Sequence, residues 1–244
     1  MLLAIDIGNT NINLGVFQGN RLVKRYCFAT KGTNYRSWLK KVCKGNKIKQ
    51  AVICSVVPLA AKLIEKELVK LLGKRPYNIG KDIIVPIKNL YRKPRQVGQD
   101  RLVNAYAAVM LYGAPLIIVD FGTAITFDVI SKDKGYLGGM ILPGLRISLE
   151  ALKRCTALLP EVELAKPKEF IGRDTRNSML SGVVYGFAAL TDSLTARIKE
   201  KLGHKVKVIG TGGNIRLLKQ YCRCFSRVDP DLTLRGINFL AKKS

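Results

Sequence analysis

Two aspartates in this chain stand where a carboxylate could handle phosphate or a cation. Asp6 and Asp120 each end an apolar run, and each precedes a turn with a glycine and a hydroxyl residue that leads into a second apolar run. The turn residues are Gly8, Asn9 and Thr10 after the first aspartate, and Gly122 and Thr123 after the second. A carboxylate can hold a cation or a water molecule, while turn N–H groups and a threonine hydroxyl can hold phosphate oxygens. The pair predicts a duplicated phosphate-binding hairpin on the two sides of a nucleotide cleft.

Either segment alone is also typical of an ordinary turn, since glycine supplies positive φ and aspartate caps its own backbone. The repetition disfavours that alternative, because both copies keep strand, Asp, Gly and returning strand in the same order. A third glycine-rich segment, residues 210–213, follows an apolar run and precedes a predicted helix, which suits an anion or the sugar-phosphate part of a nucleotide. The sequence has no Walker A motif and no strand-linked G-x-G-x-x-G fingerprint.

The elements that must position these residues also repeat. Hydrophobic patterning in the first half predicts strands over 2–5, 12–17, 22–28 and 51–57, and helices around Trp38, over 59–72 and over 100–111. The second half predicts strands over 116–120, 124–130, 135–141 and 206–209, and helices over 145–152 and 177–201. Pro115 is the predicted boundary, which gives domains of 1–114 and 115–244.

The formal charge of +25 is the least expected feature of the composition. Residues 1–114 contribute 21 basic minus 5 acidic residues, or +16, and residues 115–244 contribute 21 minus 12, or +9. Such a field could attract nucleic acid or an anionic membrane. Many of the lysines, however, fall singly on helix-like segments without interleaved aromatic residues, so a solvated basic surface is favoured over a nucleic-acid surface. Steering of anionic substrates is compatible with either surface.

The rest of the composition bears on where the protein acts and on whether cysteine or histidine chemistry is available to it. No apolar run approaches the roughly 20 residues of a membrane span, and Asp6 interrupts the opening run, so we expect a cytoplasmic protein without membrane contact. The six cysteines are scattered and His204 is the one histidine, expected in a surface loop. A zinc site and histidine-based catalysis are therefore disfavoured.

Five segments, in order along essentially the whole chain, resemble type III pantothenate kinases. They are Asp6-x-Gly8-Asn9-Thr10; Tyr91 with Pro94 and Gly98-Gln99-Asp100-Arg101; residues 120–124; residues 138–144; and Thr211-Gly212-Gly213. The Gly-x-Asp-Arg element and the Gly-Gly-x-Ile-x-Pro-Gly turn make the resemblance specific, whereas Asp-x-Gly occurs throughout the actin, Hsp70 and sugar-kinase superfamily. The resemblance implies an α/β fold of two ribonuclease-H-like domains of duplicated topology, with mixed five-stranded sheets flanked by helices around a nucleotide cleft.

The resemblance also implies a role for each matching position. The ATP-binding positions would be Asp6, Gly8, Asn9, Thr10, Asn11 and Asn13 in the first loop, Thr123 in the second, and Gly212 and Gly213. The pantothenate-binding positions would be Tyr91, Gly98, Gln99, Asp100, Arg101 and Thr175, with Asp100 as catalytic base. Asp120 matches the ligand of a monovalent cation, K⁺ or NH₄⁺, and Mg²⁺ would accompany ATP. Some relatives carry a lysine near the end of the first loop, where this chain has Asn11 and Asn13.

The implied activity is ATP-dependent phosphorylation of pantothenate to 4'-phosphopantothenate, the first step of coenzyme A biosynthesis. Asp100 would accept the proton of the attacking hydroxyl, and Arg101 could bind a carboxylate or a phosphate. On residue chemistry alone these two also fit a helix N-terminal cap and a surface cation.

Two alternatives and one assembly question stay open. A relative acting as a transcriptional regulator is disfavoured by the intact Asp6, Asp100, Asp120 and Thr123, and a different small-molecule kinase is disfavoured by the Gly-x-Asp-Arg element. The helix over 177–201 carries more apolar residues than one domain face needs, which favours packing against a partner, with burial inside its own domain as the alternative. The resemblance implies that the partner is a second copy, in a homodimer.

Overall fold

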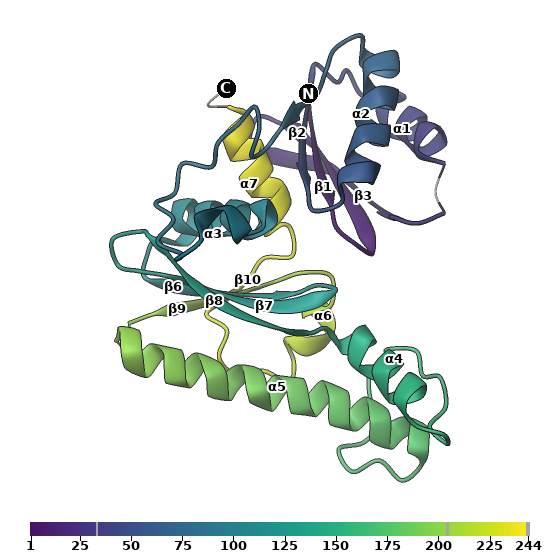
Figure 1. Cartoon of the computed structure of the whole chain (residues 1–244), viewed down its shortest axis with the longest axis vertical. Coiled ribbons are helices and arrows are strands. Elements are labelled where there is room, and N and C mark those ends of the chain that lie inside the picture. Colours follow the sequence, from purple (N-terminus) through teal and green to yellow (C-terminus); the bar gives the residue numbers. More distant parts are fainter. Residues whose placement is uncertain (33, 204, 243–244) are drawn as a thin grey trace. The chain divides into compact units, whose positions relative to one another are not determined.

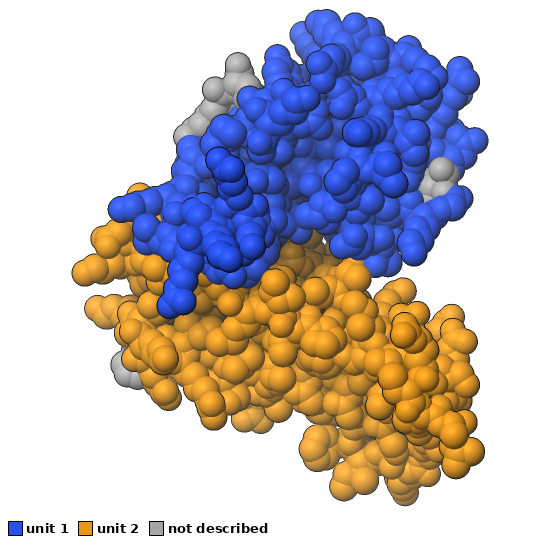
Figure 2. Space-filling model, in the orientation of Figure 1, with its two compact units in different colours: residues 1–111, 231–244 blue, residues 112–230 orange. Residues whose placement is uncertain are grey.

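The computed structural model describes residues 1–32, 34–203 and 205–242, so His204 lies outside the described residues. The chain forms two compact units (Figure 2), Met1–Leu111 with Asp231–Ser244, and Tyr112–Pro230. The first unit therefore includes a C-terminal segment that the linear division at Pro115 assigns to the second half.

The first unit is built on a mixed five-stranded sheet in the order β3-β2-β1-β4-β5. Its strands are β1 (Leu2–Ile7), β2 (Asn11–Gln18), β3 (Arg21–Ala29), β4 (Gln50–Ser55) and β5 (Tyr77–Asn78). β1, β2 and β3 form an antiparallel meander, whereas β4 lies parallel to β1 and β5 parallel to β4. The central strand β1 is almost wholly buried, as expected for a strand that is covered on two faces. The edge strand β3 alternates between exposed and half-buried residues over most of its length, as expected for a strand that is covered on one face.

Helices cover both faces of this sheet (Figure 1). They are α1 (Tyr35–Cys43), α2 (Pro58–Leu72) and α7 (Leu232–Ala241). The helix α3 (Gln99–Tyr112) packs on α7, where a Cβ on Gly236 would lie 2.6 Å from Val103, and a 3₁₀ turn η1 at Pro94–Gln96 precedes it. α1 and α2 pack with Leu3, Ile5 and Trp38 in one apolar core. α7 covers the opposite face, because a Cβ built on Gly15 of β2 would lie 3.3 Å from Leu234.

The second unit repeats the topology in the order β10-β9-β6-β7-β8. Its strands are β6 (Leu116–Phe121), β7 (Ala124–Ile130), β8 (Tyr136–Pro143), β9 (Lys207–Thr211) and β10 (Arg227–Val228). β6 is antiparallel to β7 and parallel to β9, as β1 is to β2 and β4. The predicted fold class of duplicated mixed five-stranded sheets flanked by helices is confirmed.

One long helix supports the second sheet. Figure 1 shows α5 (Thr175–Leu202) running along a face of it, with α4 (Leu145–Cys155) packed beside the start of α5. The Asp174 carboxylate caps α5 by accepting the N–H of Asn177 at 2.7 Å. The helix expected after the glycine-rich segment is only α6 (Ile215–Leu218). Across the described residues, no helix has both the length and the apolar character needed to span a bilayer.

Candidate active site

Asp6 lies at the carboxyl end of β1, between two neighbouring strands. It is opposite Asn13 in β2 and opposite Cys54 in β4. Side chains that are directly opposite in adjacent strands share a face of the sheet, so these three groups lie together. Asn13 Nδ2 donates to Asp6 Oδ2 at 3.4 Å. The sheet register thus fixes the aspartate between a neutral amide and a buried thiol.

The first loop is a tight turn that exposes its polar residues. The N–H of Gly8 donates to the carbonyl of Asn11 at 3.0 Å, and a Cβ on Gly8 would lie 3.2 Å from that oxygen. Glycine is needed here for close approach and not for a left-handed φ. Asn9, Thr10 and Asn11 are exposed, as residues that contact a ligand must be.

Thr30, which directly follows β3, holds this loop in shape. Its hydroxyl donates to the carbonyl of Gly8 at 2.7 Å, and its N–H donates to the carbonyl of Thr10 at 2.9 Å. The sequence analysis did not identify Thr30. In the sequence, Thr30 is only a hydroxyl residue that follows a strand, and this pattern is too common to indicate a function.

The segment before α3 is organised by Asn89. Its side-chain oxygen accepts the N–H of Tyr91 at 3.0 Å, and its amide donates to the carbonyl of Pro94 at 3.2 Å. The carbonyl of Gly98 then accepts the N–H of Leu102 at 3.3 Å in the first turn of α3. Asp100 Oδ1 accepts the N–H of Arg101 at 2.8 Å. These bonds set the direction of Tyr91 and of the Gly-Gln-Asp-Arg element.

Asp6 and Asp100, both in the first unit, form a carboxylate pair in which the charge of Asp100 acts on Asp6. Burial is the main cause that raises the pKa of Asp6 to about 7, the charge of Asp100 adds to the rise, and the hydrogen bond from Asn13 opposes it. Burial also raises the pKa of Asp100, against the lowering effect of the Arg101 N–H and charge. Burial and both carboxylates raise the pKa of the Cys54 thiol. Two perturbed carboxyls in one place are typical of a site for acid–base or cation chemistry.

In the second unit, Asp120 lies between two loops. It is the last residue but one of β6, opposite Thr126 of β7 and Thr211 of β9. Gly212 has a φ of +93°, and a Cβ there would collide with Asp120 Oδ1 and lie 2.7 Å from Phe121 backbone atoms. The turn after β6 and the glycine-rich loop after β9 therefore lie against each other, with the carboxylate between them.

Gly144 explains the Gly-Gly-x-Ile-x-Pro-Gly sequence. Its N–H donates to the carbonyl of Thr123 at 3.1 Å, and a Cβ on it would collide with that oxygen. This hydrogen bond fixes the backbone of Thr123, whose own side chain is exposed. Gly213 is also exposed, and a Cβ there would meet no atom within 4 Å.

The predicted substrate residues are divided between the units. Tyr91 and residues 98–101 belong to the first unit, and Thr175 is the exposed first residue of α5 in the second. Gly172 packs on the opening turn of α5, where a Cβ would lie 2.5 Å from the Asn177 backbone. Within the described part of the chain, no three His, Cys, Asp or Glu side chains gather to hold a metal ion.

Comparison with known proteins gives a consistent match. A family model described as type III pantothenate kinase matches residues 2–197. The type III pantothenate kinase of Agathobacter rectalis is 39% identical over 253 residues, covering 100% of this chain and 97% of that protein. The type III pantothenate kinase of Anaeromyxobacter dehalogenans is 40% identical over 253 residues and covers 100% of both chains.

Solved structures share the fold at lower identity. A conserved putative Baf family transcriptional activator from Campylobacter jejuni superimposes with a TM-score of 0.57 at 21% identity, covering 99% of this chain and 97% of that one. A ROK family glucokinase from Streptomyces griseus, in complex with glucose and AMPPNP, gives a TM-score of 0.51 at 13% identity, covering 100% and 99%. These likenesses concern the fold alone.

Asp6→Asn should stabilise the protein at pH 8 and flatten its stability against pH. A carboxyl whose pKa is raised by folding contributes fully to stability below its unfolded pKa of 3.8 and loses that contribution as the pH rises to about 7. The neutral amide removes this loss, so the free energy of unfolding should rise by about 1–3 kcal/mol at pH 8 and little at pH 4. Urea unfolding at both pH values measures the change. The exposed Asp133→Asn variant is the control, and an equal effect in both variants would contradict the burial of Asp6.

Proposed function

Because this chain belongs to the type III pantothenate kinase family, we propose that it transfers the γ-phosphoryl group of ATP to the primary hydroxyl of pantothenate. The product is 4'-phosphopantothenate, and the reaction belongs to coenzyme A biosynthesis. The full-length relatives are named as kinases, so the alternative of a transcriptional regulator is not favoured.

The carboxylate pair of Asp6 and Asp100 is the observation that best supports this chemistry. Phosphoryl transfer needs a carboxylate that orients and deprotonates the attacking hydroxyl. Burial moves the pKa of Asp100 upward, toward the range in which a general base works best. The N–H of Arg101 fixes Oδ1 of this carboxylate, so the base has a defined direction. We assign Asp100 as the catalytic base.

The two loops and the glycine-rich segment would hold ATP. Asn9, Thr10 and Asn11 are exposed on a turn that Thr30 braces, and Thr123 is exposed on a turn that Gly144 braces. Gly212 and Gly213 would offer backbone N–H groups to the nucleotide. Asn13 would act from β2 through its hydrogen bond to Asp6.

Magnesium would enter with the nucleotide, beside Asp6. The ion usually keeps several waters and takes one or two carboxylates together with substrate phosphates. Asp6 fits such a group, because burial and the charge of Asp100 disfavour its ionised form and raise its pKa. A nearby cation would favour that ionised form and offset both effects. When bound, the ion would neutralise charge that develops on the transferred phosphoryl group.

Pantothenate would be held mainly by the segment before and into α3. Tyr91 and residues 98–101 supply a ring, backbone groups, an amide and a fixed cation. The Arg101 guanidinium suits the carboxylate of pantothenate, since its planar fork can donate two parallel hydrogen bonds. We place Thr175 at the same substrate, from the start of α5.

A monovalent cation would be held at Asp120. A Cβ on the adjoining Gly122 would lie 3.4 Å from Asp120 Oδ1 and 3.3 Å from the carbonyl of Ala124, so carboxylate and carbonyl oxygens are close neighbours there. Hard cations prefer such oxygens. K⁺ or NH₄⁺ at this position would lie beside the second phosphate loop.

Assembly as a homodimer through α5 is also part of the proposal. Val183, Val184 and Ala188 are buried in the core of their own unit and Phe187 packs against it, so the apolar surplus read from the sequence is largely used within the chain. The outer face is different, since Gly182 and Gly186 are exposed and a Cβ on either would meet no atom within 4 Å. Small residues on an open helix face permit close contact with a second helix.

The basic surface would serve the anionic substrates. Both ATP and pantothenate are anions, and a positive field raises the rate at which such ligands arrive. We propose a cytoplasmic enzyme that uses its charge in this way, without a role in nucleic-acid or membrane binding.

Asp100→Asn should reduce kcat by a factor on the order of 100 or more while ATP affinity stays nearly unchanged. The amide keeps the size of the side chain but cannot accept the proton of the hydroxyl. Pantothenate-dependent ADP release, measured by a coupled assay, gives kcat, and calorimetry gives the affinity for ATP. Asp133→Asn controls for the loss of one surface charge. Near-normal turnover would remove Asp100 from this role.

Activity should be higher in potassium or ammonium than in sodium, and Asp120→Ala should abolish this preference. The variant lacks the carboxylate that would hold the cation. Initial rates in the three chlorides at equal ionic strength and saturating magnesium test the point. Equal rates for the unchanged enzyme in all three salts would count against a specific site.

Gly186→Arg should weaken the dimer by about tenfold or more and raise KM for pantothenate, because a long charged side chain would occupy the open face of α5. Light scattering after size-exclusion chromatography gives the mass, and steady-state assays give KM. Gln18→Arg, at the exposed end of β2, is the matched control. KM should rise because Thr175, placed at the substrate, begins the same helix, which would couple assembly to pantothenate binding. A monomeric variant with unchanged kinetic constants would refute this coupling.

A further inference from the structure

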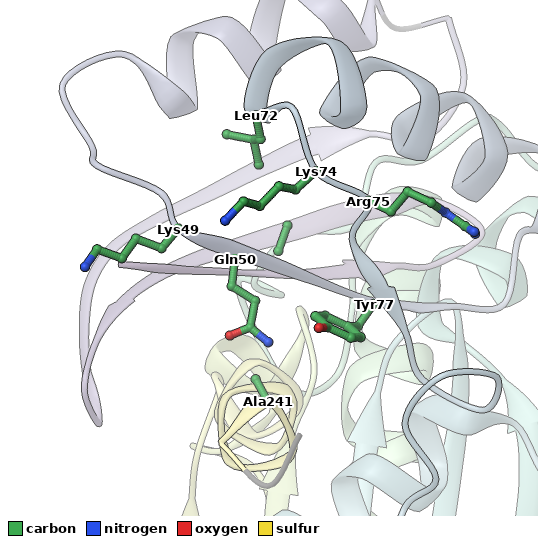
Figure 3. Close-up of a pocket in the computed structure, with 8 residues that line it drawn as sticks. Lys49, Gln50, Leu72, Lys74, Arg75, Tyr77 and Ala241 are labelled. Carbon is green, nitrogen blue, oxygen red and sulfur yellow. The ribbon is translucent and has the colours of Figure 1, made fainter.

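A hollow of about 430 Å³ opens in the first unit at the amino end of β4 (Figure 3). Its apolar lining comes from Ala51, Leu72 and Ala241, with Leu72 and Ala241 on opposite sides of β4. These residues belong to β4, to the end of α2 and to the end of α7, so three elements that are distant in sequence meet there. The volume lies within the roughly 300–1,000 Å³ range typical of small-molecule sites.

Cations and neutral donors line the rest of the hollow. Lys49, Lys74 and Arg75 supply three positive charges, Gln50 and Tyr77 supply an amide and a phenol, and no carboxylate is among the lining residues. A basic lining without a carboxylate favours an anion and disfavours a metal ion.

Only two of the three cations in the lining are available to a ligand. Arg75 donates through Nε and Nη2 to Glu65 Oε1, at 3.0 and 2.8 Å, so its charge is already paired. Among the described residues, Lys49 and Lys74 make no ion pair. The two lysines therefore carry the net charge of the hollow. An ammonium is a compact charge on a flexible stem, which suits a phosphate.

The neutral donors are placed by the sheet. Tyr77 is opposite Val52, and Gln50 precedes Val52 by two residues, so the side chains of Gln50 and Tyr77 share one face. Figure 3 shows both extending toward Ala241, while Lys74 extends over the start of β4. The lining thus supplies two hydrogen-bond donors as well as positive charge, and donors give a bound group a direction.

The hollow is distinct from the site of phosphoryl transfer. Gln50 begins β4, whereas Cys54, opposite Asp6, is near its carboxyl end. Four residues of strand separate them by about 13 Å. A ligand in the hollow would therefore not contact the Asp6 and Asp100 carboxylates.

We propose that this hollow, lined by Lys49, Gln50, Lys74 and Tyr77, is a second anion site that binds the phosphate group of a small molecule. The group can belong to free phosphate or pyrophosphate, or to a phosphorylated metabolite. The lysines neutralise the phosphate, the amide and phenol donate to its oxygens, and the apolar lining accommodates whatever small group the phosphate carries.

Amide chemical-shift mapping of the ¹⁵N-labelled protein tests the site. Inorganic phosphate, pyrophosphate and AMP are titrated separately, in low-salt buffer and with saturating AMPPNP and magnesium in the nucleotide site. Saturable shifts are expected at the amides of residues 49–51 and at Lys74, Arg75 and Tyr77. The three titrations separate the sources, because tighter binding of AMP indicates a ligand larger than phosphate. The proposal is overturned if these amides do not shift with any of the three.

A pair of double variants separates a built site from general charge. Lys49→Gln with Lys74→Gln should weaken phosphate or pyrophosphate binding at these amides by about tenfold or more, since both unpaired cations are lost. Lys62→Gln with Lys66→Gln removes the same charge from the exposed face of α2 and should change binding less than about twofold. Equal weakening of binding by both double variants would show that the general positive field of the protein causes the effect, and it would refute the site. The ¹⁵N spectrum of each variant confirms that it is folded.

Discussion

The first unit holds two carboxylates of like charge close together in a partly buried place. Asp6 is fixed by the pairing of β1 with β2 and β4, and Asp100 by the opening turn of α3. Burial and the charge of Asp100 raise the pKa of Asp6 to about 7, so the ionised form of Asp6 is destabilised in the folded protein. The surrounding register, the asparagine at position 13 and the turn of α3 all serve to keep that arrangement in place. A cation would offset this effect of the Asp100 charge, and phosphoryl transfer brings one in with the nucleotide.

The two halves obtain the same loop geometry by different local means. In the first half, Gly8 allows the turn to close on the carbonyl of Asn11, and Thr30 braces it from the end of β3. In the second, Gly144 approaches the carbonyl of Thr123, and Gly212 lies against Asp120. The topology is duplicated, but the contacts that shape each phosphate loop are specific to each copy. Glycine is required mostly because another backbone is near, and only Gly212 of these three has a left-handed φ.

The sequence predicted the strands, the long helices and the position of both aspartates, because these depend on short-range patterns. Strands with clear alternation or strongly apolar runs, such as β1 and β6, differ from expectation by one or two residues. β5 and β10, with two residues each, are too short to produce a pattern. α7 was not foreseen, since Gly236 interrupts its apolar face, and this glycine is explained only by a Cβ contact of 2.6 Å with Val103. The coupling of Asp6 to Asp100 spans residues far apart in the chain, so no local pattern could reveal it.

The return of α7 to the first unit bears on the order in which the protein can fold during synthesis. Asn238 donates to the carbonyl of Gly19, Thr233 donates to Asn104, and Arg25 pairs with Asp231 at 3.0 Å, so the last helix is joined to the first strands and to α3. On a ribosome, residues 112–230 are complete and continuous before α7 emerges. The second unit can therefore fold first, while the first unit keeps one face of its sheet uncovered until α7 has been synthesised.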